Sequence, residues 1–336
     1  MPPEGSEGMM VNVEASYRHY VHIIGASMQP DQLALQLDSP LMGKAKNDRN
    51  LMVYAWFGLN REKQMELPVY DDGKVRIEVT GTKHGVANIW DAELLIYLAS
   101  IIQERINLGI VPEPLVSFAA HDFFRITETK PGGSSYDRLE EGLARLRGTL
   151  IRTNIETGGE GESEGFGWID SYKIQYRRGR DGEKIMKAIQ VRICDWLFRA
   201  IVKDRRMLTY DPRYFKLAPL EKRLYEIARA HCGNQNGFKI NLLKLHRRIG
   251  TAMEPRFFKA QLVKMAKRKS PLPEYGFMLV DPRVKLSVDK KSLPPPGRTP
   301  LKSWMVFFFR TDRLAQMPAF AVAPEVYDDF PASDLP

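Results

Sequence analysis

The sequence predicts an α+β fold in which three helices followed by a β-hairpin occur twice. In each half of the chain, apolar residues recur at helical spacing in three segments, and stretches with the composition of strands follow them. A chain of 336 residues, 43% of them hydrophobic, is long enough for two domains with separate cores. Three helices and a hairpin are the order of a winged helix-turn-helix, so we expect two tandem domains of this kind.

The first half contains three predicted helices. The longest spans about 91–108, where Asp91 suits the N-cap, leucines and isoleucines form one apolar stripe, and Gly109 ends the helix. A short helix is expected at about 119–126 and a third at about 134–148. Strands are expected at 51–57, 74–80, 150–156, 166–176 and 187–193, with the acidic segment 157–165 as a hairpin tip.

The second half repeats this order without repeating the sequence. Pro219 suits the first turn of a helix at about 219–232, and two further helices are expected at about 241–249 and 254–269. The expected strands are 276–280, 284–288 and 304–310, of which the last two flank a loop rich in proline and lysine. The predicted organisation is a mobile N-terminal tail at 1–48, a first winged-helix domain at 49–204, a basic second winged-helix domain at 205–312, and an acidic C-terminal tail at 313–336.

The charge distribution points to a polyanion as partner. The chain carries 50 Lys and Arg against 41 Asp and Glu, a net charge of +9. Between Lys239 and Lys302 there are 16 basic and 4 acidic residues, a local net of +12, so the rest of the chain sums to −3. An excess gathered in one segment is typical of a nucleic-acid-binding surface.

The predicted helix at 254–269 lies within this basic segment. Phe258, Leu262, Met265 and Ala266 form its apolar seam, and the remaining positions are basic with no acidic partner inside the helix. We interpret this face as a DNA-binding surface; a plain basic surface is the alternative. The expected contact residues are Arg256, Lys259, Lys264, Lys267 and Arg268, with Lys285, Lys290, Lys291 and Arg298 on the wing, whose loop could instead be a proline-rich spacer.

The predicted helix at 134–148 is the second candidate. Ser134 and Asp137 have capping-box spacing, and two glycines before the helix leave room for a phosphate at its N-terminus. Arg138 and Arg145 are expected opposite the apolar side, so we predict DNA contacts from Ser134, Ser135, Arg138 and Arg145. The alternative is a capped surface helix with solvated charges.

Enzymatic chemistry finds little support in the sequence. The two cysteines and six histidines show no CxxC, HExxH or His-x-His spacing, and there is no GxxxxGK[ST] loop. We therefore expect no catalytic residues, no metal and no cofactor. The start of the chain shows no secretory signal and its longest apolar run is too short to span a bilayer, so a cytoplasmic protein without a membrane partner is expected.

Several separated stretches, in order over roughly residues 44–280, resemble the replication initiator protein A family of bacterial plasmids. They are Leu51-Met-Val-Tyr-Ala-Trp-Phe57, His84-Gly-Val-Ala-Asn-Ile-Trp-Asp-Ala-Glu93, Gly133-Ser-Ser-Tyr-Asp-Arg-Leu-Glu-Glu-Gly-Leu-Ala-Arg-Leu-Arg-Gly-Thr149, Phe166-Gly-Trp-Ile-Asp170, Leu220-Glu-Lys-Arg-Leu-Tyr225 and Ala230-His-Cys-Gly233.

The resemblance implies a plasmid replication initiator in the bacterial cytoplasm. It implies two winged-helix domains that bind repeated double-stranded DNA sites at a plasmid origin, recruitment of the host initiator and the replicative helicase, and a homodimer under dimer–monomer control. A plasmid-borne transcriptional repressor has the same physical signature and stays open as an alternative. A DNA-nicking enzyme is the rival of another class, and the missing metal ligands argue against it.

Overall fold

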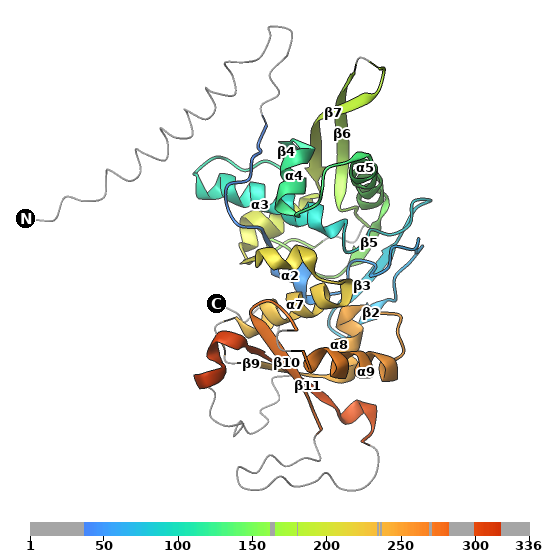
Figure 1. Ribbon diagram of the computed structural model, residues 1–336, viewed down its shortest axis with the longest axis vertical. Coiled ribbons are helices and arrows are strands. Elements are labelled where there is room, and N and C mark those ends of the chain that lie inside the picture. Colours follow the sequence, from blue (N-terminus) through green and yellow to red (C-terminus); the bar gives the residue numbers. More distant parts are fainter. Residues whose placement is uncertain are drawn as a thin grey trace, which may run out of the picture. The chain divides into compact units, whose positions relative to one another are not determined.

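The computed structural model describes residues 37–316, apart from 162–164, 180, 234, 236, 269–270 and 282–298. The protein is a mixed α/β protein. Its first half is built around helix α3 (Ala92–Asn107), in which every residue from Ala92 to Ile102 is buried. Strand β4 (Leu115–Phe118) and helices α4 (Ala120–Ile126) and α5 (Gly133–Gly148) follow (Figure 1). Strands β6 (Ile169–Arg178) and β7 (Lys184–Ile193) then form a long hairpin, and β4 joins it to give the antiparallel order β4-β7-β6.

The second half has the same element order. Helix α7 (Pro219–Cys232) is followed by strand β9 (Gly237–Asn241), helices α8 (Leu242–Ile249) and α9 (Pro255–Ala266), and strands β10 (Tyr275–Val280) and β11 (Met305–Arg310) (Figure 1). The sheet order is β10-β11-β9, all antiparallel. In both halves, therefore, the strand after the first helix pairs with the last strand of the hairpin.

The remaining elements connect and cover these two arrangements. Strand β1 (Lys46–Asp48) pairs with β8 (Met207–Thr209), and β2 (Tyr70–Asp71), β3 (Arg76–Thr80) and β5 (Leu150–Thr153) form a small antiparallel sheet. Helix α6 (Asp195–Arg199) continues as one π-helical turn, Ala200–Asp204. The other elements are helix α2 (Arg49–Val53) and the 3₁₀ turns Pro212–Lys216, Leu301–Ser303 and Thr311–Gln316.

Two expectations about the first half are wrong. The predicted strand at 51–57 begins as helix α2, because Asp48 accepts a hydrogen bond from the Asn50 amide and caps a turn that is buried on all sides. The segment 157–165, of which 162–164 lie outside the described residues, does not join two regularly paired strands, since β5 pairs with β3 and β6 pairs with β7. A single bridge between Ile151 and Phe166 joins the two flanks of that segment. The expected strand at 284–288 lies outside the described residues.

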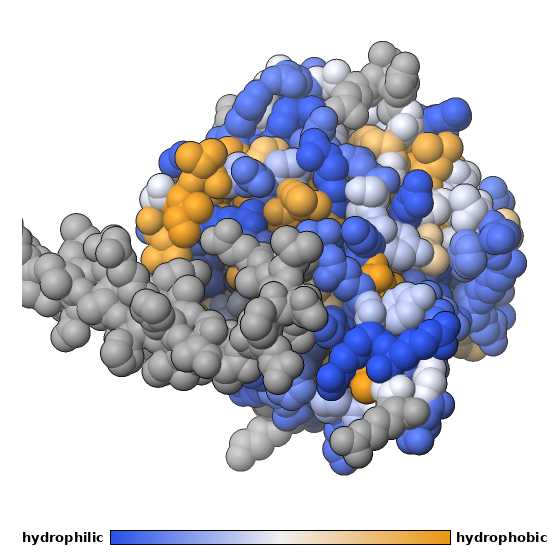
Figure 2. All heavy atoms as spheres, turned by 90° about the horizontal axis from the view of Figure 1, so that it is seen from above, coloured by the Kyte–Doolittle hydropathy of each residue, from blue (hydrophilic) through white to orange (hydrophobic). Residues whose placement is uncertain are grey.

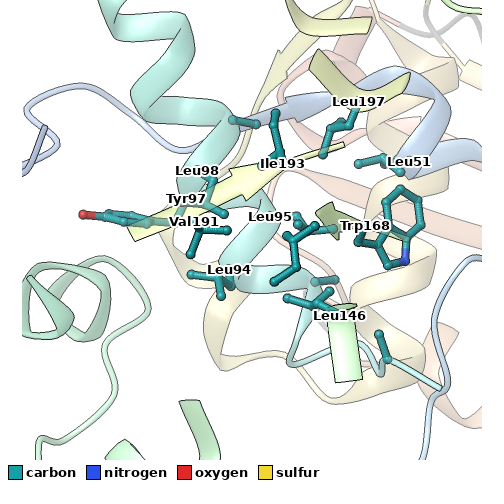
Figure 3. Packing of buried hydrophobic residues seen from close by; sticks show 14 of the residues in the cluster. Leu51, Leu94, Leu95, Tyr97, Leu98, Leu146, Trp168, Val191, Ile193 and Leu197 are labelled. Carbon is teal, nitrogen blue, oxygen red and sulfur yellow. The ribbon is translucent and has the colours of Figure 1, made fainter. Parts of the chain in front are cut away.

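Two hydrophobic clusters fill the interior. In the first, leucines of α3 pack with side chains of α5, β7 and α6 and with Trp168 (Figure 3). The second is built on α7, α8 and α9. It also includes four buried side chains from the first half of the chain: Ala45, Met52, Val53 and Ile96. The second core therefore draws on residues on both sides of the predicted boundary at 204/205.

Residues 38–45, part of the predicted N-terminal tail, are tied to the body by carboxylates. Glu104 accepts hydrogen bonds from the amides of Met42 and Gly43, and Asp122 accepts one from the amide of Leu41. Asp38 pairs with Arg105. These bonds show that the folded body includes the residues from Asp38 onward, earlier than residue 49.

Exposed apolar side chains occur at several separate places. Val111 is 80% exposed, Met42 73% and Phe257 55%. Figure 2 shows one face of the protein, on which hydrophobic side chains form patches among hydrophilic ones. A single exposed apolar residue is common on protein surfaces and marks nothing by itself.

Candidate nucleic-acid interface

The turn between α8 and α9 has a fixed geometry. Gly250 ends α8 with φ of +74°, a left-handed conformation that favours glycine. The His246 ring bonds the Met253 carbonyl at 2.6 Å and meets the buried Phe258 ring edge-on. Pro255 then occupies the first turn of α9. Together these contacts set the direction in which α9 leaves the turn.

Helix α9 has one buried side and one exposed side, as the sequence predicted. Phe258, Leu262 and Met265 are buried in the second core. Lys264 and Lys267 lie on the opposite side and are exposed, and within the described ranges neither has an ion-pair partner. The exposed side therefore presents two ammonium groups that an anion can bind.

The other three predicted cations of α9 already have contacts within the protein. Arg256 pairs with Glu254 at 2.7 Å, and Arg268 pairs with Glu221 of α7. The Lys259 ammonium lies 3.3 Å from the centre of the Trp304 ring, a cation–π contact. Arg256 and Arg268 are both more than 45% exposed in their ion pairs, so each can still reach a phosphate by exchanging its partner.

The wing residues Lys285, Lys290, Lys291 and Arg298 lie outside the described residues. The strands that carry the loop are described: β10 and β11 pair in register from Tyr275–Arg310 to Val280–Met305. The Thr299 hydroxyl donates a hydrogen bond of 2.6 Å to the Asp281 carboxylate, which joins the two ends of the loop.

Helix α5 begins differently from the prediction. Gly132 is its N-cap residue and no side chain caps the helix, so Ser134 is not part of a capping box. Ser134 is exposed, whereas Ser135 is buried. The Ser135 hydroxyl donates to the Lys130 carbonyl at 2.8 Å and accepts from the exposed Arg138 guanidinium at 3.0 Å. Ser135 therefore holds Arg138 in position, and it is itself too buried to make the predicted DNA contact in this conformation.

Arg145 faces inward, contrary to the predicted outward position. Its guanidinium donates two hydrogen bonds, of 2.8 and 2.9 Å, to the buried Asp91 carboxylate at the start of α3. The Asp91 hydrogen bond raises the pKa of Arg145 against the opposing effect of burial. This bidentate pair joins α5 to α3, and it makes Arg145 a structural residue in the free protein.

The hairpin β6–β7 carries a basic surface that the sequence interpretation missed. Six of its basic side chains are exposed: Lys173, Arg177, Arg178, Lys184, Lys187 and Arg192, of which Arg192 pairs with Asp170 and Asp195. Tyr176, 49% exposed, lies among them with the Lys184 ammonium 4.9 Å from its ring centre. Lys187 lies at an irregularity in the pairing, where Gln175 faces Ala188 and Tyr176 faces Met186. The sequence signal for this surface is the basic run Arg177-Arg178-Gly179-Arg180. It does not by itself predict a wing, because the sequence does not show that the strands on either side of it pair.

Signs of other chemistry are absent from the described residues. No group of three His, Cys, Asp or Glu side chains there is arranged to hold a metal ion. None of the helices in the described ranges has the length and apolar character needed to cross a membrane. Both cysteines are buried, and burial raises the pKa of the Cys232 thiol to about 12, far from the range of a reactive thiolate.

A family model described as Replication initiator protein A matches residues 46–277, more than half of the chain. The chain belongs to this family. A curated protein of Wigglesworthia glossinidia brevipalpis named "Putative replication protein" is 37% identical over 211 residues, which cover 62% of this chain and 75% of that protein.

Two solved structures also align with the chain. Domains 2 and 3 of RctB match 76% of this initiator with 15% identity and a TM-score of 0.51, covering 94% of the RctB chain. At this identity the likeness shows a shared fold and nothing more. The Pi initiator protein in complex with iteron DNA matches 74% of the chain at 14% identity with a TM-score of 0.38, covering 98% of that protein.

Proposed function

We propose that this replication initiator binds repeated double-stranded DNA sites at a plasmid origin through two tandem winged helix-turn-helix domains: 49–204, with the attached residues 38–48, and 205–312. The observation that carries the proposal is α9: its exposed side presents Lys264 and Lys267 directly opposite its buried seam. Membership of the initiator family supports the biological role. The repeated order of helix, strand, two helices and hairpin supports the domain assignment.

In the second domain, α9 enters the major groove and its lysines contact phosphates at the groove edges. The loop between β10 and β11 follows as a wing, on which Lys285, Lys290, Lys291 and Arg298 contact the backbone. In the first domain, α5 has the corresponding place. Arg138, held by Ser135, contacts a base edge, Ser134 contacts a phosphate, and the hairpin β6–β7 supplies the wing.

The first domain is expected to contribute less phosphate affinity through its helix than the second. Asp137, Glu140 and Glu141 are exposed on α5 beside Arg138, whereas the exposed side of α9 carries no acidic residue between Pro255 and Ala266. In the first domain the basic residues lie instead on β6–β7. We therefore assign base recognition to α5 and backbone contact to its hairpin.

The mechanism proposed is binding and distortion of duplex DNA, without bond cleavage. The family also suggests recruitment of the host initiator and replicative helicase, a homodimer, and action in the bacterial cytoplasm. With no catalytic residue assigned, purified protein with Mg²⁺ should leave supercoiled origin DNA uncut.

Footprinting on the DNA that flanks the gene tests the proposal. An initiator protects several repeats, each about two helical turns long. Arg138→Ala should lower affinity for a repeat by about 1–3 kcal/mol and affinity for random DNA much less, because a base contact is lost. Arg147→Ala, at an exposed position in the last turn of α5, is the matched control and should change neither. A single protected operator over the promoter indicates a repressor instead, and the absence of any protected site contradicts DNA recognition altogether.

A further inference from the structure

The N-terminal part of α9 presents an apolar group on the side that faces away from the core. Phe257 is 55% exposed and Met253, in the turn before the helix, is 38% exposed. Ala260 is exposed one turn after Phe257. Because residues three and four apart share a helix face, Phe257, Ala260 and Lys264 lie in one row opposite the buried seam.

This apolar group is held in place by the turn and by its basic neighbours. The bond between the His246 ring and the Met253 carbonyl fixes the turn. The Arg256 guanidinium lies 4.5 Å from the centre of the Phe257 ring, and Glu254 holds that guanidinium at 2.7 Å. Arg256 therefore covers one part of the Phe257 ring, and the rest of the ring is exposed to solvent.

We propose that Phe257, with Met253 and Ala260 beside it, recognises thymine by contact with its 5-methyl group in the major groove. The inference rests on the proposed function, in which α9 enters that groove. Residues near the start of a recognition helix contact base edges, and the thymine methyl is the one apolar group that base edges present there. In this arrangement Lys264 and Lys267, further along the same side of the helix, contact phosphates at the edges of the groove.

An exposed apolar group of this kind can also bind another protein, but the residues around Phe257 favour DNA. Further along the same side, the exposed residues of the helix are Lys264 and Lys267, and lysine is depleted in protein interfaces. Alternating apolar and cationic side chains match a surface on which methyl groups lie between two rows of phosphates.

Replacing thymine with deoxyuridine, which removes the methyl group alone, tests the proposal in the full chain. Duplexes carrying the footprinted repeat are prepared with each thymine replaced in turn, and affinities are measured by fluorescence anisotropy. Wild-type protein should lose about 4-fold at one or two positions, the factor for about 0.8 kcal/mol per buried carbon. Phe257→Ala should bind the natural repeat at least 4-fold more weakly and lose nothing further at those positions.

Two control variants separate this role from others. Lys264→Ala should weaken binding to every duplex by a similar factor and keep the deoxyuridine effect, because it removes a phosphate contact. Val111→Ala, at an exposed apolar position elsewhere, should behave as wild type. Since Phe257 is exposed, its alanine variant should melt at the wild-type temperature.

The outcomes distinguish this inference from the proposed function. Wild-type binding that is indifferent to every deoxyuridine, or a Phe257→Ala variant that keeps the full deoxyuridine effect, overturns thymine recognition and leaves DNA binding intact. A variant that binds the repeat normally but fails to support plasmid replication shows that Phe257 contacts a protein, which also overturns it. If no repeat is bound specifically, the proposed function and this inference fall together.

Discussion

Lys222 of α7 and Glu93 of α3 form an ion pair in which the two side chains are only 1% and 9% exposed. Burial raises the pKa of Glu93 to about 7, although the Lys222 ammonium opposes the shift. The pair joins the central helices of the two halves. Arg223, the next residue, is also buried and donates hydrogen bonds to the Met52 and Tyr54 carbonyls of the first half. The two adjacent buried cations Lys222 and Arg223 therefore join the second half of the chain to the first.

Removing one member of this pair should destabilise the protein strongly. Lys222→Met leaves Glu93 buried without its cation, so the free energy of unfolding should fall by about 3–5 kcal/mol. The double variant Lys222→Met/Glu93→Leu should recover most of the loss because no buried charge remains. Urea denaturation measures both. Equal stability of the wild type and Lys222→Met would contradict a structural role for the pair.

Asp48 gives a pH-dependent prediction with a defined sign. It is fully buried, one of its carboxylate oxygens has no hydrogen-bond partner in the described part of the chain, and burial raises its pKa from 3.8 to about 6. The folded state therefore binds the proton more tightly than the unfolded state, and stability is lost as the pH rises from about 4 through 6.

Asp48→Asn should remove this loss and keep the cap of α2, since Asn and Asp are equal N-caps. We expect the variant to be more stable than wild type by on the order of 2 kcal/mol at pH 8, and equal to it below about pH 4. Denaturation curves at the two pH values measure the difference. A variant less stable at pH 8 would show that the carboxylate charge is favourable in the fold.

The Asp91–Arg145 pair predicts an unusual glycine effect in α5. A Cβ atom at Gly142 would lie 2.8 Å from an Asp91 carboxylate oxygen, which Arg145 holds in place. Gly142→Ala should therefore destabilise by about 1–2 kcal/mol, although alanine has the higher helix propensity. Gly133→Ala is the matched control in the same helix, because nothing lies within 4 Å of its Cβ position. Thermal melts of both variants check this, and a neutral or stabilising Gly142→Ala would refute the crowding.

Periodicity alone predicted the longer amphipathic and buried helices. The helices α3, α5, α7, α8 and α9 lie within a few residues of their expected bounds. The run 51–57 was assigned wrongly because a short apolar stretch buried on all sides has no periodicity that separates helix from strand. Its helical start depends on a cap from Asp48, a residue of the predicted N-terminal tail.

The candidate site was predictable only in part, for a similar reason. The row of basic residues on α9 follows from helical spacing alone. The inward position of Arg145 depends on Asp91, 54 residues earlier, and Lys259 is engaged by Trp304 in another strand. A cation on the polar side of a helix appears free in the sequence until its partner from a distant element is known.

The dependence of DNA affinity on salt tests the central claim, that the exposed side of α9 is the main DNA-binding surface. For the wild type, log affinity against log salt should have a slope on the order of −5 to −8. Lys264→Ala/Lys267→Ala should make the slope shallower by about 2, since each phosphate contact contributes about 0.9. Lys63→Ala/Lys83→Ala removes the same charge from exposed loops of the first half and should leave the slope unchanged. A slope that is equal in the α9 variant and the wild type would contradict the account.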